Sequence, residues 1–313
     1  MTRSSTQPLY VDAARLEAAL PFAAAVDALA EGFGATLPES PERSHFTLAG
    51  GGELLLMPAH GPQGAGVKLV TLCRTNPSRG LPLIHGVFAL FDPDTLALEA
   101  LVDGAALTAM RTAAVSALAT RLLAREDAER LVIFGAGRQA RAHLDAMLAV
   151  RPIRWVGVVD PDRGHADALL AEARRHGLAA EAVDADAVAT ADLICTCTTS
   201  ATPVLDGARV MPGAHVNAMG AYRPHDRELD AALMARGRIV VETRAAALAE
   251  AGDLVLAIAE GAISADDVVA DLAEVLAGAP ARRSDEDVTV FKSVGVAFED
   301  LVVARAACRR LRA

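Results

Sequence analysis

The chain has 313 residues, a formal net charge of −10, 52% hydrophobic residues and only 4% aromatic residues, which allows two domains with separate cores. Lysine and arginine form no clustered basic face, so the composition argues against nucleic acid as a partner. The polar start at residues 1–9 and the lack of a membrane-length apolar run predict a cytoplasmic protein with no membrane partner.

The first part of the chain predicts an α+β region. Apolar residues recur at helical spacing over residues 13–33, which predicts one helix. A turn-rich break follows at 38–44, and short β segments separated by Gly and Pro occupy 46–102. This pattern favours a mixed or mainly antiparallel sheet. An Ala-rich helix expected over 103–124 leads into the next region.

From residue 129 onward the pattern alternates between short apolar strands and helices, which predicts a parallel, doubly wound sheet. The expected elements are strands at 131–134, 155–159, 191–197, 214–218 and 238–241, and helices at 137–150 and 163–176. Cys195 and Cys197 are too close in sequence for an ordinary metal-site pair, and we predict no metal site.

A glycine motif, G-x-G-x-x-A, spans residues 135–140 between the first of these strands and its helix. Gly135 permits a tight turn, Gly137 lets a pyrophosphate approach the backbone, and Ala140 allows close helix–strand packing. The start of the helix presents free N–H groups to the phosphates. We therefore predict a Rossmann domain with a nicotinamide dinucleotide. The expected loop contacts are Gly135, Ala136, Gly137, Arg138 and Gln139.

Polar residues after two other strands extend this predicted site. Asp160 lies at the distance where such domains carry an acidic residue for the adenosine ribose, which favours NAD(H) because the carboxylate repels a 2′-phosphate. Arg163 leaves NADP(H) possible, and Asp160 has the alternative role of starting a turn before Pro161. Thr198 and Thr199 either contact the nicotinamide ribose or cap the following turn.

Three basic residues in the first region stand out. Lys68 lies within an apolar strand, where a lysine can protect a sheet edge. Arg111 lies on the Ala-rich helix and Arg43 follows the Pro-rich break. Composition alone favours structural roles for all three.

Six short motifs occur in one order along the chain and together resemble the ornithine cyclodeaminase/mu-crystallin family. The resemblance runs from about Arg43 to the C-terminus. The motifs are Gly66-Val-Lys-Leu-Val70, Asp103-Gly104, Thr108-Ala-Met-Arg-Thr-Ala-Ala114, the glycine loop, Arg223-Pro-His-Asp-Arg-Glu-Leu-Asp230 and Val290-Phe-Lys-Ser-Val-Gly295.

The resemblance implies a homodimer built by an N-terminal substrate-binding domain at 1–118, joined by a C-terminal helix at 293–313, with the Rossmann domain at 119–292. It also implies that Arg43, Lys68 and Arg111 bind the carboxylate of a small substrate, with Lys68 and Arg111 as catalytic residues. The cofactor contacts that it implies are Thr112, the glycine loop, Asp160, Thr199, Ala218, Met219 and Ser293.

One position departs from the cyclodeaminase pattern. Cyclodeaminases carry an aspartate shortly after the glycine of an Asn-Ala-x-Gly segment, and here that position is Tyr222, which supplies no carboxylate at neutral pH. Asp226 lies nearby as a possible displaced carboxylate. The amino-acid sequence of this segment resembles that of the ketimine-reducing branch of the family.

The resemblance therefore implies NAD(P)H-dependent reduction of a cyclic ketimine carboxylate. The product would be L-proline from Δ1-pyrroline-2-carboxylate, or L-pipecolate from Δ1-piperideine-2-carboxylate. The alternatives are an ornithine cyclodeaminase, an alanine dehydrogenase and, more distantly, a non-catalytic protein that binds a small ligand.

Overall fold

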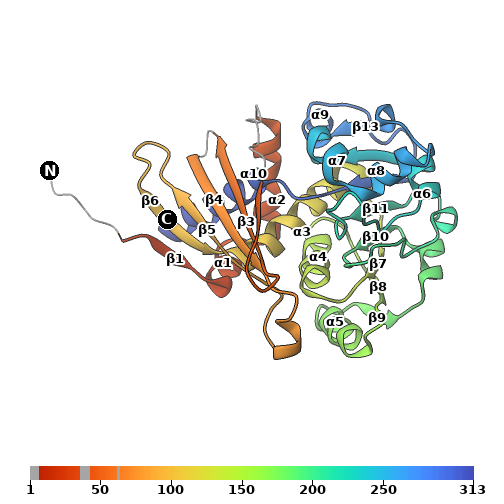
Figure 1. Ribbon diagram of the computed structural model, residues 1–313. Helices are drawn as coiled ribbons and strands as arrows, with labels where there is room; N and C mark the ends of the chain where they lie inside the picture. The colour runs from red at the N-terminus through yellow and green to blue at the C-terminus, as the bar shows by residue number, and fades with distance from the viewer. Residues whose placement is uncertain (1–6, 36–42, 62–63) are drawn as a thin grey trace. The chain divides into compact units, whose positions relative to one another are not determined.

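The structure is a computed structural model that describes residues 7–35, 43–61 and 64–313 (Figure 1). The chain divides into two compact units, one formed by Met1–Arg111 with Val296–Ala313 and the other by Thr112–Gly295. The first boundary falls inside helix α3 (Gly104–Leu123) and the second directly before helix α10 (Ala297–Arg312). The predicted boundaries, after residues 118 and 292, lie seven residues later and three residues earlier than the boundaries in the structure.

The first unit contains a mixed sheet. Among the described residues, its six strands are ordered β1-β6-β5-β4-β3-β2, with β1 parallel to β6 and the other pairs antiparallel. Their bounds are Leu9–Val11, Ser44–Thr47, Glu53–Gly61, Gly64–Leu72, Ile84–Phe91 and Leu98–Asp103 for β1 to β6. Helix α10 contacts α1 (Ala13–Ala19), α2 (Phe22–Gly34) and strands β3, β4 and β5. The last segment of the chain thus covers one face of a sheet made by the first hundred residues.

The prediction of a single helix over residues 13–33 is wrong. The structure has two helices there, because α1 ends at Ala19 and α2 begins at Phe22. Pro21 lies at the break, where it has no backbone N–H to donate and its ring would clash with the preceding turn. The predicted turn at 38–44 lies outside the described residues except for its last two positions.

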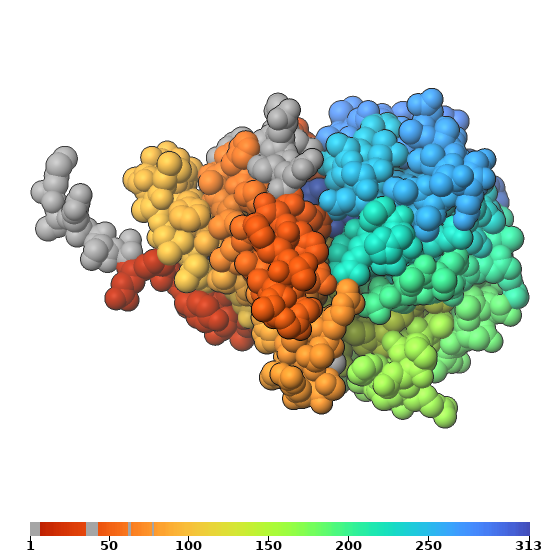
Figure 2. Space-filling view, viewed as in Figure 1, coloured from red at the N-terminus to blue at the C-terminus, as the bar shows by residue number. Residues whose placement is uncertain are grey.

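Alternation along the strands gives the sheet two different faces. Met57, Lys68, Phe88 and Val102 are paired across β3, β4, β5 and β6, and all four are buried on the face that α10 covers. Side chains one residue away point to the opposite face. There Leu69 is 37% exposed and Phe46 of β2 is 49% exposed. The segment around residue 50, which connects β2 and β3 and is drawn in orange, lies at the surface in Figure 2.

The second unit confirms the predicted doubly wound α/β fold. Within the described part of the chain, eight strands form one parallel sheet in the order β13-β12-β14-β11-β10-β7-β8-β9. Strands β7 (Arg130–Phe134), β8 (Trp155–Val159) and β9 (Ala179–Ala182) run to one edge, and β10 (Leu193–Thr196) starts the other half. The order therefore reverses between β7 and β10, where α/β folds bind ligands.

The remaining strands and the helices of this unit complete the fold. The strands are β11 (His215–Ala218), β12 (Arg238–Val241), β13 (Val268–Asp271) and β14 (Thr289–Lys292), and the helices are α4 (Arg138–Leu148), α5 (Arg163–Arg175), α6 (Ala231–Arg236), α7 (Arg244–Glu250), α8 (Gly252–Ala259) and α9 (Leu272–Leu276). The last strand, β14, inserts between β11 and β12. It thereby brings residues near 292 beside strand ends from much earlier in the chain.

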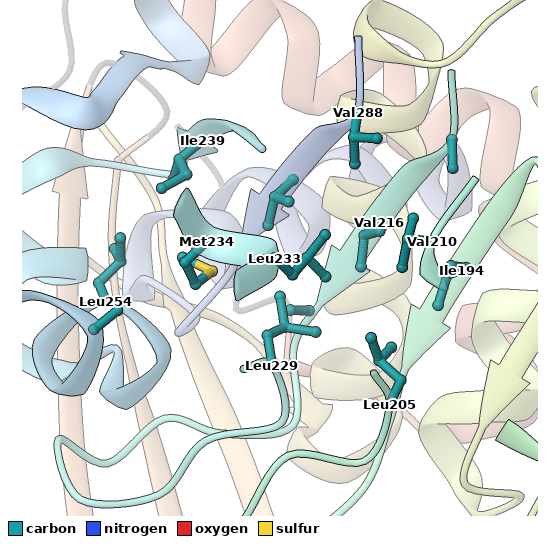
Figure 3. Close-up of a cluster of buried hydrophobic side chains, with 14 of the residues drawn as sticks. Ile194, Leu205, Val210, Val216, Leu229, Leu233, Met234, Ile239, Leu254 and Val288 are labelled. Atoms are coloured by element: carbon teal, nitrogen blue, oxygen red, sulfur yellow. The ribbon is translucent and has the colours of Figure 1, made fainter. Parts of the chain in front are cut away.

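The core of the second unit is built mainly from Ala, Val, Leu and Ile. Figure 3 shows part of it, with Ile194 and Val216 on neighbouring strands and Leu229 and Leu233 beside them. Phe134 is the only aromatic member of the buried cluster within the described residues. Small side chains let helices lie close to the sheet, which explains how a chain with 4% aromatic residues fills its core.

Candidate active site

Lys68 is held in the first unit by an acidic residue from the end of the chain. Strand β4 points Lys68 to the buried face, where its Nζ donates a hydrogen bond of 2.7 Å to Oδ2 of Asp300. The Lys68 side chain is 2% exposed and that of Asp300 is 0% exposed. Burial lowers the pKa of Lys68 to about 8, although the charge of Asp300 acts in the opposite direction.

Arg111 of α3 joins the same group. Its Nη1 donates a hydrogen bond of 2.8 Å to Oε2 of Glu299, and its Nε lies 3.5 Å from Oδ1 of Asp300. Both carboxylates lie in the first turn of α10, where the helix dipole favours negative charge. The structure therefore brings Lys68 and Arg111 together through Asp300.

Arg43, the third basic residue of the prediction, is half-buried and directly precedes β2. The first paired residue of β2, Ser44, lies opposite Leu56, and the next residue of β3, Met57, lies opposite Lys68. Arg43 therefore lies beside the row of the sheet that contains Lys68.

The glycine loop of the second unit has the geometry that a dinucleotide needs. Gly135 has φ +86°, and a Cβ on it would lie 2.6 Å from the carbonyl oxygen of Cys197. A Cβ on Gly137 would meet no atom within 4 Å, so this position is open to a ligand. Helix α4 begins directly after Gly137 without a side-chain cap, which leaves its first N–H groups available to phosphate.

Asp160 is fixed by the backbone around it. Its Oδ2 accepts a hydrogen bond of 2.6 Å from the N–H of Ala136, and its Oδ1 accepts one of 2.7 Å from the N–H of Asp162. The bond from Asp162 is the contact expected if Asp160 starts a turn before Pro161. Because each carboxylate oxygen can accept more than one hydrogen bond, the turn role leaves acceptor sites for a ribose.

The residues that follow β10, β11 and β14 lie at the same edge of the parallel sheet as the glycine loop. Thr198 donates its hydroxyl to Glu228 and accepts from the N–H of Ser200, so it makes the predicted turn contact, while Thr199 is exposed. Ala218 is the buried last residue of β11 and Met219 is half-buried.

Two buried side-chain oxygens of the second unit are available to a bound dinucleotide. Thr112 of α3 is 3% exposed, and its hydroxyl has no hydrogen-bond partner among the residues that the structure describes. The side-chain carbonyl oxygen of Gln139 on α4 is also buried and has no hydrogen-bond partner among these residues. Buried polar atoms are normally paired, so these atoms call for a ligand or water. Arg138 and Arg163 are exposed at the starts of α4 and α5.

The sequence interpretation missed Glu228, which organises this edge. Glu228 is fully buried and accepts from the hydroxyl of Thr196, from the hydroxyl and N–H of Thr198, and from the N–H of Gly220. Four such donors stabilise a buried carboxylate without a cation. Glu228 thereby ties the segment after β10 to the segment after β11. Its place in the motif at 223–230 was a signal that could have identified it.

Two more buried carboxylates hold the segment after β14. Asp253 accepts a hydrogen bond from the N–H of Glu228 and lies 2.8 Å from the Nζ of Lys292. Glu242 accepts from the hydroxyl of Ser293 at 2.7 Å and from the N–H of Gly295. The hydroxyl proton of Ser293, a predicted cofactor contact, is therefore directed at Glu242.

Tyr222 and Asp226 both lie in the second unit. Tyr222 is 38% exposed, with the guanidinium of Arg223 5.5 Å from its ring centre. The side chain of Asp226 is 25% exposed and lies 4.0 Å from the imidazole of His225. An exposed phenol in place of a carboxylate changes the chemistry available at this position.

The described residues contain neither a cluster that could bind a metal ion nor a helix that could span a membrane. No group of three or more His, Cys, Asp or Glu side chains there has the arrangement of a metal site. In the same residues, no helix has the length and apolar character needed to cross a membrane.

Known proteins match this chain over nearly its full length. The model of the ornithine cyclodeaminase/mu-crystallin family matches residues 11–313. A Δ1-pyrroline-2-carboxylate reductase of Paracoccus denitrificans is 37% identical, over 97% of each chain. The solved Δ1-pyrroline-2-carboxylate reductase of Thermococcus litoralis, in complex with NADH and L-proline, has a TM-score of 0.91 and 32% identity and covers 97% of each chain. An archaeal alanine dehydrogenase dimer with bound NAD also has a TM-score of 0.91, with 30% identity, covering 97% of this chain and 96% of that one.

Proposed function

The chain belongs to the ornithine cyclodeaminase/mu-crystallin family, and on this premise we propose that it reduces cyclic ketimine carboxylates with NAD(P)H. The preferred substrate in this proposal is Δ1-pyrroline-2-carboxylate, which would give L-proline, with Δ1-piperideine-2-carboxylate as the six-membered analogue. The relatives from Paracoccus denitrificans and Thermococcus litoralis support this choice by their activity. The observation that carries it is the buried pair of cations, Lys68 and Arg111.

These two cations suit a substrate that carries a carboxylate. A guanidinium can bind a carboxylate through two parallel hydrogen bonds, and an ammonium adds a compact positive charge with three N–H groups. Asp300 takes one N–H of Lys68. In the proposal, Arg111 and Lys68 bind the substrate carboxylate, and Arg43 beside the same row of the sheet adds a third positive charge.

Reduction of a C=N bond also needs a proton at nitrogen. Bound NAD(P)H supplies the hydride for the imine carbon. Lys68 is the candidate donor of the proton, because burial brings the pKa of its ammonium to about 8, close to neutral pH. The pKa is lowered, so Lys68 stays protonated below pH 8 and loses its proton as the pH rises further.

The second unit would hold the dinucleotide at the glycine loop. Gly135 and Gly137 shape the loop, the start of α4 faces the phosphates, and Asp160 offers a carboxylate for the adenosine ribose. A carboxylate fixed by two backbone N–H groups repels a 2′-phosphate. We therefore propose NAD(H) as the preferred cofactor and NADP(H) as the weaker one.

Two enzymatic alternatives remain to be tested beside the reductase. The cyclodeaminase is disfavoured because Tyr222 replaces the aspartate of that branch. Alanine dehydrogenase activity is suggested by the archaeal structural relative. Both reactions act on a small amino or keto acid whose carboxylate the same cations could bind.

We also propose a homodimer that forms through the first unit. Tyr10, Phe46 and Leu69 are 58%, 49% and 37% exposed and lie on the face of the mixed sheet opposite α10. Apolar side chains on an open sheet face favour contact with another protein surface. The dimeric archaeal relative makes a second copy of this chain the preferred partner.

The decisive experiment follows NADH oxidation with Δ1-pyrroline-2-carboxylate, Δ1-piperideine-2-carboxylate, and pyruvate plus ammonia, and follows ammonia release from L-ornithine. We expect turnover of the five-membered ketimine. Lys68→Ala should reduce kcat/KM by about a hundredfold or more, since a positioned proton donor contributes at least that factor. Glu99→Gln is a matched control, because Glu99 pairs with Arg305 and Arg312 of α10 at another position.

Each other outcome points to one rival. Ammonia release from L-ornithine without net NADH change would identify a cyclodeaminase, and turnover only with pyruvate and ammonia an alanine dehydrogenase. NADH binding with no turnover of any of these substrates would leave the non-catalytic binding protein.

A further inference from the structure

The two lysines of the chain, Lys68 and Lys292, are both buried and both paired with an aspartate. Lys292 also donates a hydrogen bond of 2.6 Å to the backbone carbonyl of Ala221, so it ties two segments of the second unit together. Asp300, the partner of Lys68, differs from Asp253, the partner of Lys292, because Asp300 faces two cations. Its Oδ2 contacts Lys68 and its Oδ1 lies 3.5 Å from Nε of Arg111.

We propose that Asp300 is a positioning residue for the proposed reduction: it holds Lys68 in place as an ammonium and links it to Arg111. This inference rests on the proposed function, because it concerns the protein's own groups at the site of the ketimine carboxylate. Asp300 acts through Lys68 and Arg111 and is therefore not itself a catalytic residue.

The groups around Lys68 make Asp300 the decisive anion. Across the sheet its neighbours are Met57 of β3 and Phe88 of β5, which carry no charge. From α3 comes Arg111, whose positive charge disfavours the ammonium of Lys68, and from α10 come Glu299 and Asp300, which favour it. Of the two carboxylates, Asp300 has the larger effect, because it accepts the hydrogen bond at 2.7 Å.

The arrangement also balances charge. Lys68 and Arg111 would repel each other in a buried site, and Glu299 and Asp300 supply two negative charges beside them. Glu299 hydrogen-bonds Arg111, whereas Asp300 touches both cations. The substrate carboxylate would then meet two cations whose positions are already set, which reduces the ordering needed on binding.

A purely structural ion pair is a weak alternative. Removing two charges from water costs about as much as their mutual attraction returns, so buried pairs contribute little net stability. A structural role and a positioning role also differ in a measurable way. Loss of a structural ion pair lowers Tm and leaves the pH profile of kcat/KM in place, whereas loss of the anion beside a Lys68 that takes part in the reaction moves the pH at which activity falls.

The test compares Asp300→Asn with wild type and with Glu99→Gln, whose partner Arg305 lies on the same helix as Asp300. For each protein, kcat/KM with the ketimine is measured from pH 4 to pH 10. We expect the alkaline loss of activity in D300N to shift by about one to three pH units toward lower pH. E99Q should keep the wild-type profile, and titration of the substrate itself cancels in the comparison.

A second readout needs no turnover. Protein labelled with ¹⁵N in lysine contains two side-chain nitrogens, from Lys68 and Lys292, and the Lys68 signal can be followed against pH by NMR. We expect the Lys68 titration in D300N to move to lower pH. A wild-type protein that reduces no ketimine would refute the proposed function. The Lys68 titration would still test whether Asp300 stabilises the ammonium form of Lys68.

A folded D300N with the wild-type pH profile of kcat/KM would overturn the inference, whether or not its Lys68 titration moves. If D300N does not fold, Asp300→Glu provides the test. The longer carboxylate should keep the Lys68 titration near its wild-type position and lower kcat by about tenfold to a hundredfold, because Lys68 is displaced. Wild-type kcat in a folded D300E protein would contradict a positioning role.

Discussion

Single residues explain the expected choice of cofactor. Asp160 accepts hydrogen bonds from the N–H groups of Ala136 and Asp162, so its carboxylate is oriented before any ligand binds. A charged acceptor is worth about 1.5–3 kcal/mol to a hydrogen bond. The same charge opposes a 2′-phosphate. Asp160 therefore affects NADH and NADPH in opposite directions.

We expect Asp160→Asn to weaken NADH binding by roughly tenfold or more and to improve the relative affinity for NADPH. The measurement is the Kd of each cofactor by fluorescence titration. Arg163→Ala serves as the control, because this exposed arginine could contact only the extra phosphate and its loss should weaken NADPH alone. An unchanged ratio of the two Kd values in D160N would contradict the assignment.

The glycine loop is the element where conformation and binding can be separated. Gly135 combines φ +86° with a site for Cβ only 2.6 Å from the Cys197 carbonyl, so its side-chain hydrogen is needed for folding. Gly137 has open space where a Cβ would lie and φ −79°, which other residues adopt readily. The two glycines of one motif thus serve different purposes.

Gly135→Ala should therefore destabilise the protein by more than about 1 kcal/mol, whereas Gly137→Ala should leave Tm close to wild type. For NADH we expect the reverse pattern in the folded proteins, with G137A binding at least tenfold more weakly because its methyl group meets the pyrophosphate. Thermal unfolding and NADH titration of both variants test this. Normal NADH affinity in G137A would remove the glycine loop from the proposed site.

Elements also show why local patterns can mislead. The apolar spacing over residues 13–33 is helical throughout, yet the chain forms α1 and α2 because Pro21 interrupts the backbone hydrogen bonds. The strands at 155–159 and 238–241 were predicted with their observed bounds, because a continuous apolar run with β-branched residues has few alternatives.

At the scale of the whole molecule, the exposed apolar side chains on the open face of the mixed sheet predict that two copies of the chain associate through this face. We expect wild type to be a dimer by light scattering after size-exclusion chromatography, and Leu69→Arg to be monomeric, because a charge on this face would be buried without a partner. Leu248→Arg is a matched control, since Leu248 on α7 of the other unit is 36% exposed against 37% for Leu69. A dimeric L69R protein would show that another surface forms the dimer.

The sequence by itself determined the α/β class, the glycine loop between β7 and α4, and Lys68 and Arg111 as unusual cations, because periodicity, turn chemistry and motif wording are local properties. Only the tertiary structure decided what those cations touch. Lys68 and Asp300 are 232 residues apart, and Glu228 joins segments that follow two different strands. Such pairings depend on which distant segments the topology brings together, and no local pattern encodes that.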